Sequence, residues 1–244
     1  MKKINIKEKH LDKYKILAII AIIIIILLIV VLSSRNRIIS TYEKYLKINN
    51  DANITGKAFA IISKEKFGLD DLKFAVSKNK LCDAYSPKHK VLILSEDVCD
   101  TASLASITIV SHELGHAMQH KEDTPLFFVS RLLVNITRFT NKLILPLLII
   151  GVLLYLIQYP SADIGTYLML TSAGLFGLHV LNQILNIPLE YDASRRALKY
   201  LKENNFVSQK EYRKAKKLLG IAAQTYIAGL LDGLLILNKN KRKK

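Results

Sequence analysis

Five consecutive residues, His112 to His116, carry the most specific chemical signal in the sequence, because they read His-Glu-Leu-Gly-His. The stretch around them, from Ser103 to Gln119, contains no proline and offers an apolar face, so we expect a helix there. Side chains four residues apart lie on one face of a helix, which would bring both imidazoles to a single zinc ion. Glu113 would then lie beside the open coordination position and could accept a proton from zinc-bound water. The pattern predicts zinc-dependent hydrolysis, and the plainer alternative is a helix with two incidental histidines.

A zinc ion bound by His112 and His116 needs a third protein ligand, and two nearby positions fail as candidates. His120 lies eight residues beyond His112, about 12 Å along a helix axis, so one ion with bonds of about 2 Å cannot reach both. The extended motif of metzincin proteases would place a histidine six residues after His116, where this chain has Glu122. We therefore expect His120 to be an ordinary polar residue at a helix end.

The third ligand is expected just beyond a long uncharged run that ends at Leu189. Glu190 follows directly, and Asp192 lies two positions later. An unpaired carboxylate at the edge of an apolar block would be costly, and zinc would neutralise it. We therefore assign Glu190 as the third metal ligand, with Asp192 as its rival. Asp192 is expected to pair with Arg195 or Arg196.

The first of four apolar blocks runs from Ile16 to Leu32, with lysines before it and arginines after it. It is long enough to span a bilayer. A small-x-small cleavage site is absent after Leu32, so an uncleaved transmembrane anchor is favoured over a signal peptide.

Two further blocks follow the zinc motif, from Leu143 to Tyr159 and from Ile164 to Leu189, joined by a short connector. They predict a helical hairpin that crosses the membrane and returns. A buried globular hairpin is the alternative, because Asn182, Gln183 and Asn186 are polar for lipid. The fourth block, residues 218–238, is rich in small residues, which favours packing inside the protein.

A hairpin that crosses and returns brings the residues after it to the same side as the residues before it, and so brings Glu190 to the histidines. The expected order is a basic N-terminal tail (1–15), the anchor (16–32), the soluble part of the zinc domain (33–142), the transmembrane hairpin (143–189), the third-ligand segment with a basic helix (190–217), the fourth apolar helix (218–238) and a basic tail (239–244). The expected fold is a mainly α integral membrane protein. Its transmembrane helices accompany a small α+β catalytic domain that is zincin-like, of the gluzincin type.

The soluble segment offers one further substrate-binding hypothesis. Residues 90–94 read Lys-Val-Leu-Ile-Leu, a run typical of a β-strand, after the turn-like residues 85–87. An exposed edge strand beside the zinc helix would bind an extended peptide by strand addition, whereas the alternative is a core strand. Thr55 is expected to cap a helix from Gly56 to Phe67, and Asp70 and Asp71 to start another.

Four stretches of the sequence resemble the YugP-like neutral zinc metallopeptidases, a family of bacterial membrane proteins. They are ITGKAFA (54–60), YSPKHKVLILSEDV (85–98), SHELGHAMQ (111–119) and PLEYDASRRAL (188–198), and the resemblance runs from Thr55 to Leu237. More distantly, the chain is similar to the HtpX and CAAX-processing membrane proteases, in which HExxH is followed by a transmembrane hairpin and a glutamate ligand. Ser194 stands where that wider group has an aspartate, so the resemblance leaves open the hydrogen bond that would orient a zinc-binding histidine.

The resemblance implies a membrane-bound zinc-dependent endopeptidase that hydrolyses peptide bonds, with Zn²⁺ held by His112, His116 and Glu190 and with Glu113 as general base. Its substrate would be a protein or peptide, and membrane proteins are among the expected substrates. A second stabiliser of the oxyanion is expected, with Tyr191, Arg195 and Tyr226 as candidates. The alternative function is a non-catalytic, zinc-stabilised membrane scaffold or assembly factor, which would have no use for the base Glu113.

The net charge of +16 does not indicate a nucleic-acid partner, because the positive residues lie beside the apolar blocks. That placement favours a lipid bilayer, with anionic headgroups, as the partner. The hairpin connector from Gln158 to Gly165 lacks Lys and Arg, which places it outside and the zinc site in the cytoplasm; the basic N-terminus argues the opposite. We favour a multi-pass protein of the cell membrane with its zinc site on the cytoplasmic side.

Overall fold

The computed structural model describes residue 33, residues 36–157 and residues 162–232, and helices dominate these ranges. The expected anchor (16–32), both basic tails and residues 233–238 of the fourth apolar block lie outside the described residues. After a helical segment at 36–46, the elements are α2 (Gly56–Lys66), β1 (Lys73–Ser77), β2 (Ala84–Ser86), β3 (Val91–Ser95), α3 (Glu96–Asp100), α4 (Leu104–Lys121), α5 (Pro125–Ile157), α6 (Ala162–Glu203) and α7 (Gln209–Asp232).

The predicted helix around the zinc motif is confirmed as α4, and it is the centre of the folded domain. Ser103 caps its first turn by accepting a hydrogen bond from the Ser106 backbone N–H at 3.0 Å. Leu104, Ile107 and Leu114 are fully buried, because α2, α6 and α7 all pack against this one helix. Such burial on several sides holds α4 rigidly, and with it the histidines that it carries.

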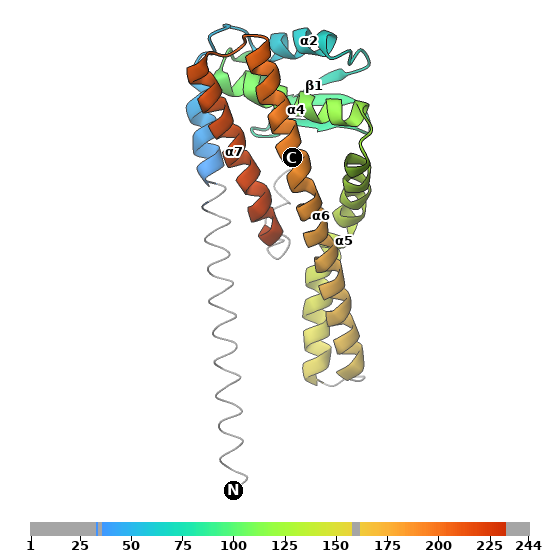
Figure 1. Ribbon diagram of the computed structural model, residues 1–244. Helices are drawn as coiled ribbons and strands as arrows, with labels where there is room; N and C mark the ends of the chain where they lie inside the picture. Colours follow the sequence, from blue (N-terminus) through green and yellow to red (C-terminus); the bar gives the residue numbers. More distant parts are fainter. Residues whose placement is uncertain (1–32, 34–35, 158–161, 233–244) are drawn as a thin grey trace.

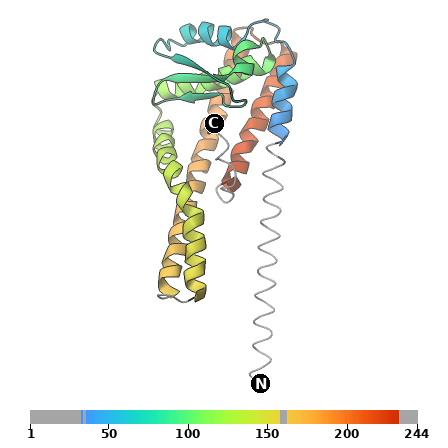
Figure 2. The same cartoon turned by 180° about the vertical axis from the view of Figure 1, so that it is seen from behind.

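The three strands form a small mixed sheet on one side of α4, visible in the rear view (Figure 2). The strand order is β1-β3-β2, with β1 parallel and β2 antiparallel to β3. The run at 90–94 therefore belongs to the central strand, with Leu92 and Leu94 buried, and the hypothesis that it forms an edge is wrong. The strand that contacts α4 at an edge of the sheet is β2.

Of the two helix starts predicted before the sheet, the structure has one. Thr55 caps α2 as expected, because its hydroxyl accepts a hydrogen bond from the Ala58 N–H. Asp70 and Asp71 do not start a helix; they form a turn that leads into β1. The segment after this turn forms β1 and not a helix. Its pairing with β3, which is distant in sequence, outweighs the local preference for a helix.

The helices α5 and α6 extend away from the domain as an antiparallel arm (Figures 1 and 2). Both are longer than the apolar blocks from which they were predicted: α5 begins at Pro125, and α6 continues without a break through Glu190 to Glu203. Both are long and apolar enough to cross a membrane, and most of their side chains are not buried within the protein.

Several amide and hydroxyl side chains of the arm contact the partner helix. Asn141 Nδ2 lies 2.9 Å from His179 Nδ1, and Asn182 Nδ2 donates to Thr137 Oγ1 at 3.3 Å. Ser130 also bonds Asn186. These contacts lie between the two helices, so they are no obstacle to a lipid-facing exterior, although Asn141 Oδ1 is buried without a partner among the described residues.

The start of the fourth apolar block packs inside the protein. α7 lies against α6 and α4, and Leu218 is buried in a small cluster with Tyr45 of the 36–46 helical segment and Ala105 of α4. The beginning of this block is therefore part of the domain that supports α4.

Candidate metal centre

Two histidines of α4 and one glutamate of α6 converge in a cluster that could hold a metal ion. Glu190 Oε2 lies 3.1 Å from His112 Nε2 and 3.4 Å from His116 Nε2. Two ligands bound at 2.0–2.1 Å to one tetrahedral ion lie about 3.4 Å apart, so these separations fit zinc. Two imidazoles and one carboxylate are also a donor set of catalytic zinc sites, which leave the fourth position open.

Each histidine ring is held by a partner on its other nitrogen. His116 Nδ1 lies 3.0 Å from Gln119 Oε1, which can only accept, so Nδ1 carries the proton. His112 Nδ1 lies 3.2 Å from the Ser194 hydroxyl. A proton on Nδ1 leaves the Nε2 lone pair of each ring for a metal. The hydrogen bond that would orient a zinc-binding histidine, which the resemblance left open at Ser194, is therefore present. Its partner is the Ser194 hydroxyl and not a carboxylate.

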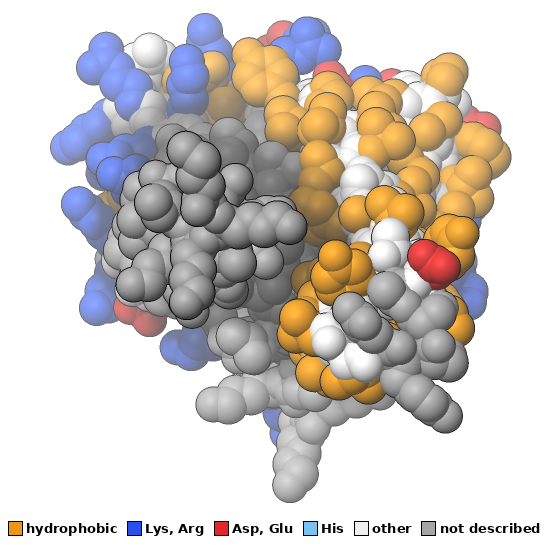
Figure 3. Space-filling model, turned by 90° about the horizontal axis from the view of Figure 1, so that it is seen from below, with side chains coloured by type: hydrophobic (Ala, Val, Ile, Leu, Met, Phe, Trp, Pro, Cys, Tyr) orange, Lys and Arg blue, Asp and Glu red, His pale blue; other side chains and the backbone are white. Residues whose placement is uncertain are grey.

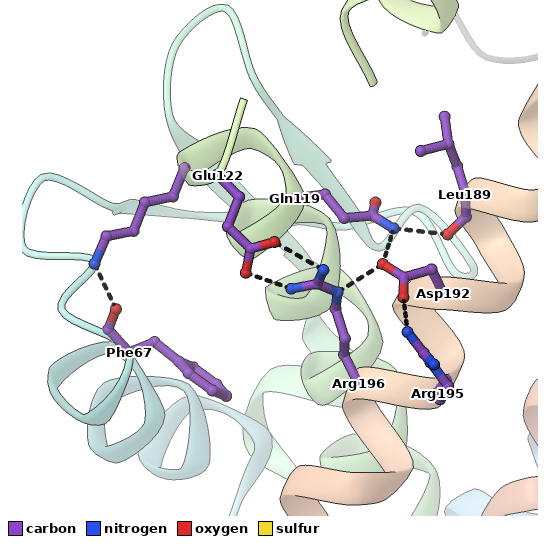
Figure 4. Close-up of polar contacts among 8 residues, drawn as sticks. Phe67, Gln119, Glu122, Leu189, Asp192, Arg195 and Arg196 are labelled. Atoms are coloured by element: carbon purple, nitrogen blue, oxygen red, sulfur yellow. Dashed lines mark hydrogen bonds and ion pairs between the residues drawn. The ribbon is translucent and has the colours of Figure 1, made fainter. Parts of the chain in front are cut away.

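Gln119 ties the metal-site end of α4 to α6. Its side-chain N–H groups donate to the Leu189 carbonyl at 2.8 Å and to Asp192 Oδ2 at 3.0 Å (Figure 4). One amide therefore orients His116 through its oxygen and fixes the turn that carries Glu190 through its nitrogen. The sequence could have revealed Gln119, because it lies three residues after His116 on the same helix face.

Asp192 points to the arginines and not to the histidines. Arg195 Nη2 donates to Asp192 Oδ1 at 2.8 Å and Arg196 Nε to Oδ2 at 2.6 Å, which confirms the expected pairing. Arg196 also forms a bidentate pair with Glu122 at the end of α4, at 2.5 and 2.8 Å (Figure 4). These charges hold the two helices together beside the metal cluster.

Gly115 permits the close approach of α6 that the cluster requires. A Cβ atom built on Gly115 would lie 2.7 Å from the Ala193 carbonyl oxygen and 3.1 Å from the Ala193 Cα. Ala193 is one helical turn from both Glu190 and Ala197, so α6 approaches α4 through small residues next to the ligand. Because residue 115 is a glycine, α6 can come this close to the metal cluster.

Glu113 lies beside the edge strand of the sheet. The Tyr85 backbone N–H donates to Glu113 Oε2 at 2.8 Å. Burial raises the pKa of the Glu113 carboxyl above its ordinary value, although His112 and His116 act in the opposite direction. A raised pKa suits a group that must first accept and then release a proton near neutral pH. The sequence could not reveal the Tyr85 contact, because a backbone donor carries no residue signature.

Electrostatic interactions link Glu190 to the two histidines. Burial alone would lower the pKa of His116, but the Glu190 carboxylate beside it raises that pKa to about 9. Burial would likewise raise the pKa of Glu190, and its hydrogen bonds to His112 and His116 lower it instead. The carboxylate therefore carries its charge among the imidazoles, as a metal ligand must.

The other candidate residues whose side chains the structure describes lie outside this cluster. His120 bonds the Tyr85 hydroxyl through Nδ1 at 2.7 Å and Arg131 through Nε2 at 3.2 Å. Tyr191 is 71% exposed, and Arg195 is engaged by Asp192. Tyr226 lies in the part of α7 whose side chains are not described. None of the oxyanion candidates is therefore placed at the metal cluster by the described residues.

A helix with two histidines four residues apart, a glutamate between them and a second helix that adds a carboxylate is the arrangement of a zinc-dependent hydrolase. The family described as "Putative neutral zinc metallopeptidase" matches residues 19–240 of the chain, and the chain belongs to this family. The chain is also 31% identical over 199 residues to "Putative membrane protease YugP" of Bacillus subtilis (strain 168), covering 81% of this chain and 84% of that protein. No solved structure matches the chain.

Proposed function

We propose that this protein is a membrane-bound endopeptidase that hydrolyses peptide bonds with zinc held by His112, His116 and Glu190. The observation that carries the proposal is the position of Glu190, which α6 brings between the two histidines. It supplies the third ligand that the sequence motif lacks and leaves a fourth position for water. Zinc bound there would acidify that water and polarise the scissile carbonyl.

Glu113 is the group that moves the proton. Its Oε2 is engaged by the Tyr85 N–H, which leaves the other carboxylate oxygen to take a proton from the attacking water. The same group then delivers the proton to the leaving amine. A non-catalytic scaffold would need the three ligands, but it would have no use for a carboxylate held next to the open position.

The free edge of β2 is the part of the site that would hold substrate. The Tyr85 N–H points to Glu113 and so away from β3, and the N–H and C=O of one strand residue point to the same side. The Tyr85 carbonyl can therefore accept a hydrogen bond from an extended peptide that adds to this edge. This arrangement keeps the strand-addition hypothesis and moves it from residues 90–94 to β2.

The decisive test replaces Glu113 by Gln. The variant should keep its zinc, because Glu113 is not a ligand, and lose at least about 100-fold in rate as expected for a missing general base. Metal analysis of the purified protein gives the first result. The membrane proteomes of cells with the parent protein or the variant give the second, because uncut substrate should accumulate only in the variant.

A matched control is Glu65→Gln on the exposed side of α2, which should behave as the parent protein. If Glu113→Gln cleaved as fast as the parent, the protease mechanism would be wrong, and the scaffold function would take its place.

We propose that α5 and α6 cross the membrane and that the metal centre lies on its cytoplasmic side. Extraction by alkaline carbonate, which strips peripheral proteins, should leave the protein in the pellet. Release into the supernatant would contradict this part of the proposal. A cysteine placed in the connector between α5 and α6 should react with an impermeant reagent added outside the cell.

A further inference from the structure

The length of α6 gives the height of the metal centre above the membrane. Asp163 is the last charged residue before the uncharged run from Ile164 to Leu189, and Glu190 is the next one. At about 1.5 Å per residue, Asp163 and Glu190 lie about 40 Å apart along one unbroken helix. The hydrocarbon core of a bilayer is about 30 Å thick, so Glu190 lies about 10 Å beyond it in an upright helix. A tilt of about 20–40° reduces this distance to about 1–8 Å.

The partner helix gives an independent measure of the same boundary. Lys142 and Arg138 are exposed on α5, and they lie about 22 and 28 Å from Ile157 at its far end. Cationic side chains on such a helix extend to the headgroups. The bilayer boundary nearer to the domain therefore runs near Arg138, below the level of Glu190.

The surface of α5 above that boundary is still apolar. Phe128 is 61% exposed and Leu132 is 52% exposed, and Phe128 lies about 43 Å from Ile157, at about the height of Glu190. Seen from the far end of the arm, hydrophobic side chains continue from the arm onto the neighbouring surface, while Lys and Arg gather along the opposite rim (Figure 3). Exposed aromatic groups beside cationic ones suit the headgroup layer better than open water.

Hydrogen bonds connect this part of α5 to the substrate edge. Arg131 Nη1 lies 3.2 Å from His120 Nε2, and the Tyr85 hydroxyl lies 2.7 Å from His120 Nδ1. Arg131 lies about 39 Å from Ile157, which is again the height of the headgroup layer. Tyr85, whose backbone contacts Glu113, is therefore held at that height by its own side chain.

We propose that the substrate of the metal centre is the juxtamembrane segment of another membrane protein, cut within about 10 Å of the hydrocarbon boundary. An extended chain that leaves a transmembrane helix crosses this distance in about three residues at 3.3 Å each. A folded soluble protein offers no extended segment at the height of the headgroups, where Tyr85 of β2 is held. The inference rests on the proposed peptidase function and adds to it the class of substrate.

The experiment maps new protein N-termini in whole cells that carry either the parent protein or Glu113→Gln. Termini that depend on Glu113 should lie within about ten residues of the end of a transmembrane helix in other membrane proteins. If they lie in soluble proteins, or in domains far from the membrane, this inference is overturned while the peptidase function stands. If no terminus depends on Glu113, the proposed function fails, and this inference with it.

A second measurement uses one substrate found in this way. A semi-rigid helical linker of about 20 residues, inserted between its transmembrane helix and its cut site, holds the cut site about 30 Å farther from the hydrocarbon boundary. Cleavage should slow by at least tenfold, whereas the same linker on the opposite side of the helix should change nothing. An unchanged rate with the first linker would contradict the inference.

Discussion

The part of α6 below Leu189 exposes large apolar side chains such as Leu170, Leu181 and Ile184, whereas the part above Glu190 exposes the cations Arg195 and Lys199. The buried side chains show the opposite distribution, with polar groups in the lower part and apolar groups in the upper part. The lower part buries His179 and Asn182 against α5, and the upper part buries Ala193 and Leu201 in the domain core.

One continuous helix therefore changes its surroundings near Leu189, and Glu190, the proposed third metal ligand, is the first residue after the change. The lower half has the pattern of a helix in lipid, with polar side chains as contacts between helices. The upper half has the pattern of a helix in a soluble domain. Glu190 is therefore positioned by both halves of α6, because the lower half sets its height and the upper half packs it against α4.

The largest effect is expected at the ligand itself. Glu190→Ala should lose zinc entirely, because only two protein ligands remain. Asp192→Ala is the matched control one half-turn away, and it should keep zinc, since Asp192 contacts Gln119, Arg195 and Arg196. Metal analysis of both purified variants checks the prediction. If Glu190→Ala kept all of its zinc and Asp192→Ala lost it, Asp192 and not Glu190 would be the third ligand.

The close approach of α6 to α4 should be the next most sensitive feature. Gly115→Ala places a methyl group against the Ala193 backbone, and it should lower the free energy of unfolding by about 1–3 kcal/mol and weaken zinc binding. Gly174→Ala is the control in the lower half, where a Cβ meets nothing within 4 Å. It should change stability by no more than about 1 kcal/mol. Thermal unfolding in detergent measures both, and equal effects would remove the contrast between the halves.

A smaller effect is expected at the hydroxyl that orients His112. Ser194→Ala removes the partner of His112 Nδ1 and should weaken zinc binding about tenfold, whereas Ser194→Asp should restore it. Competition with a zinc chelator measures the affinity. Ser172→Ala in the lower half removes a bond to the Ile144 carbonyl and should leave zinc affinity unchanged. If Ser194→Ala bound zinc as tightly as the parent, the hydroxyl would not orient the ligand.

The smallest effect is expected between the helices of the arm. Asn182→Leu loses its bond to Thr137 and should lower the free energy of unfolding by about 0.6 kcal/mol. Leu181→Asn, one residue away on the exposed face, should lower that free energy more, because it places an unpartnered amide in hydrocarbon. A neutral or stabilising Leu181→Asn would mean that this face meets water.

Local rules gave most of the metal cluster in advance. The helical spacing of His112 and His116 needs no knowledge of the tertiary structure, and Glu190 followed from the logic of a hairpin that returns. Strand order did not follow, because the pairing of β1 with β3 is a long-range choice that the residues of either strand leave open. The Tyr85 contact to Glu113 was equally hidden, because a backbone N–H belongs to almost every residue.

In the order of the chain, α5 and the apolar part of α6 separate the two histidines from Glu190, and this order affects how the protein is made. A ribosome that adds about 5–20 residues per second reaches Glu190 roughly 4–15 s after His116. During that interval α5 and the apolar part of α6 are translated. In the proposed protease, a chain in which α6 has not yet packed against α4 holds two of the metal ligands without the third, so the site stays incomplete until both helices of the arm are made and folded.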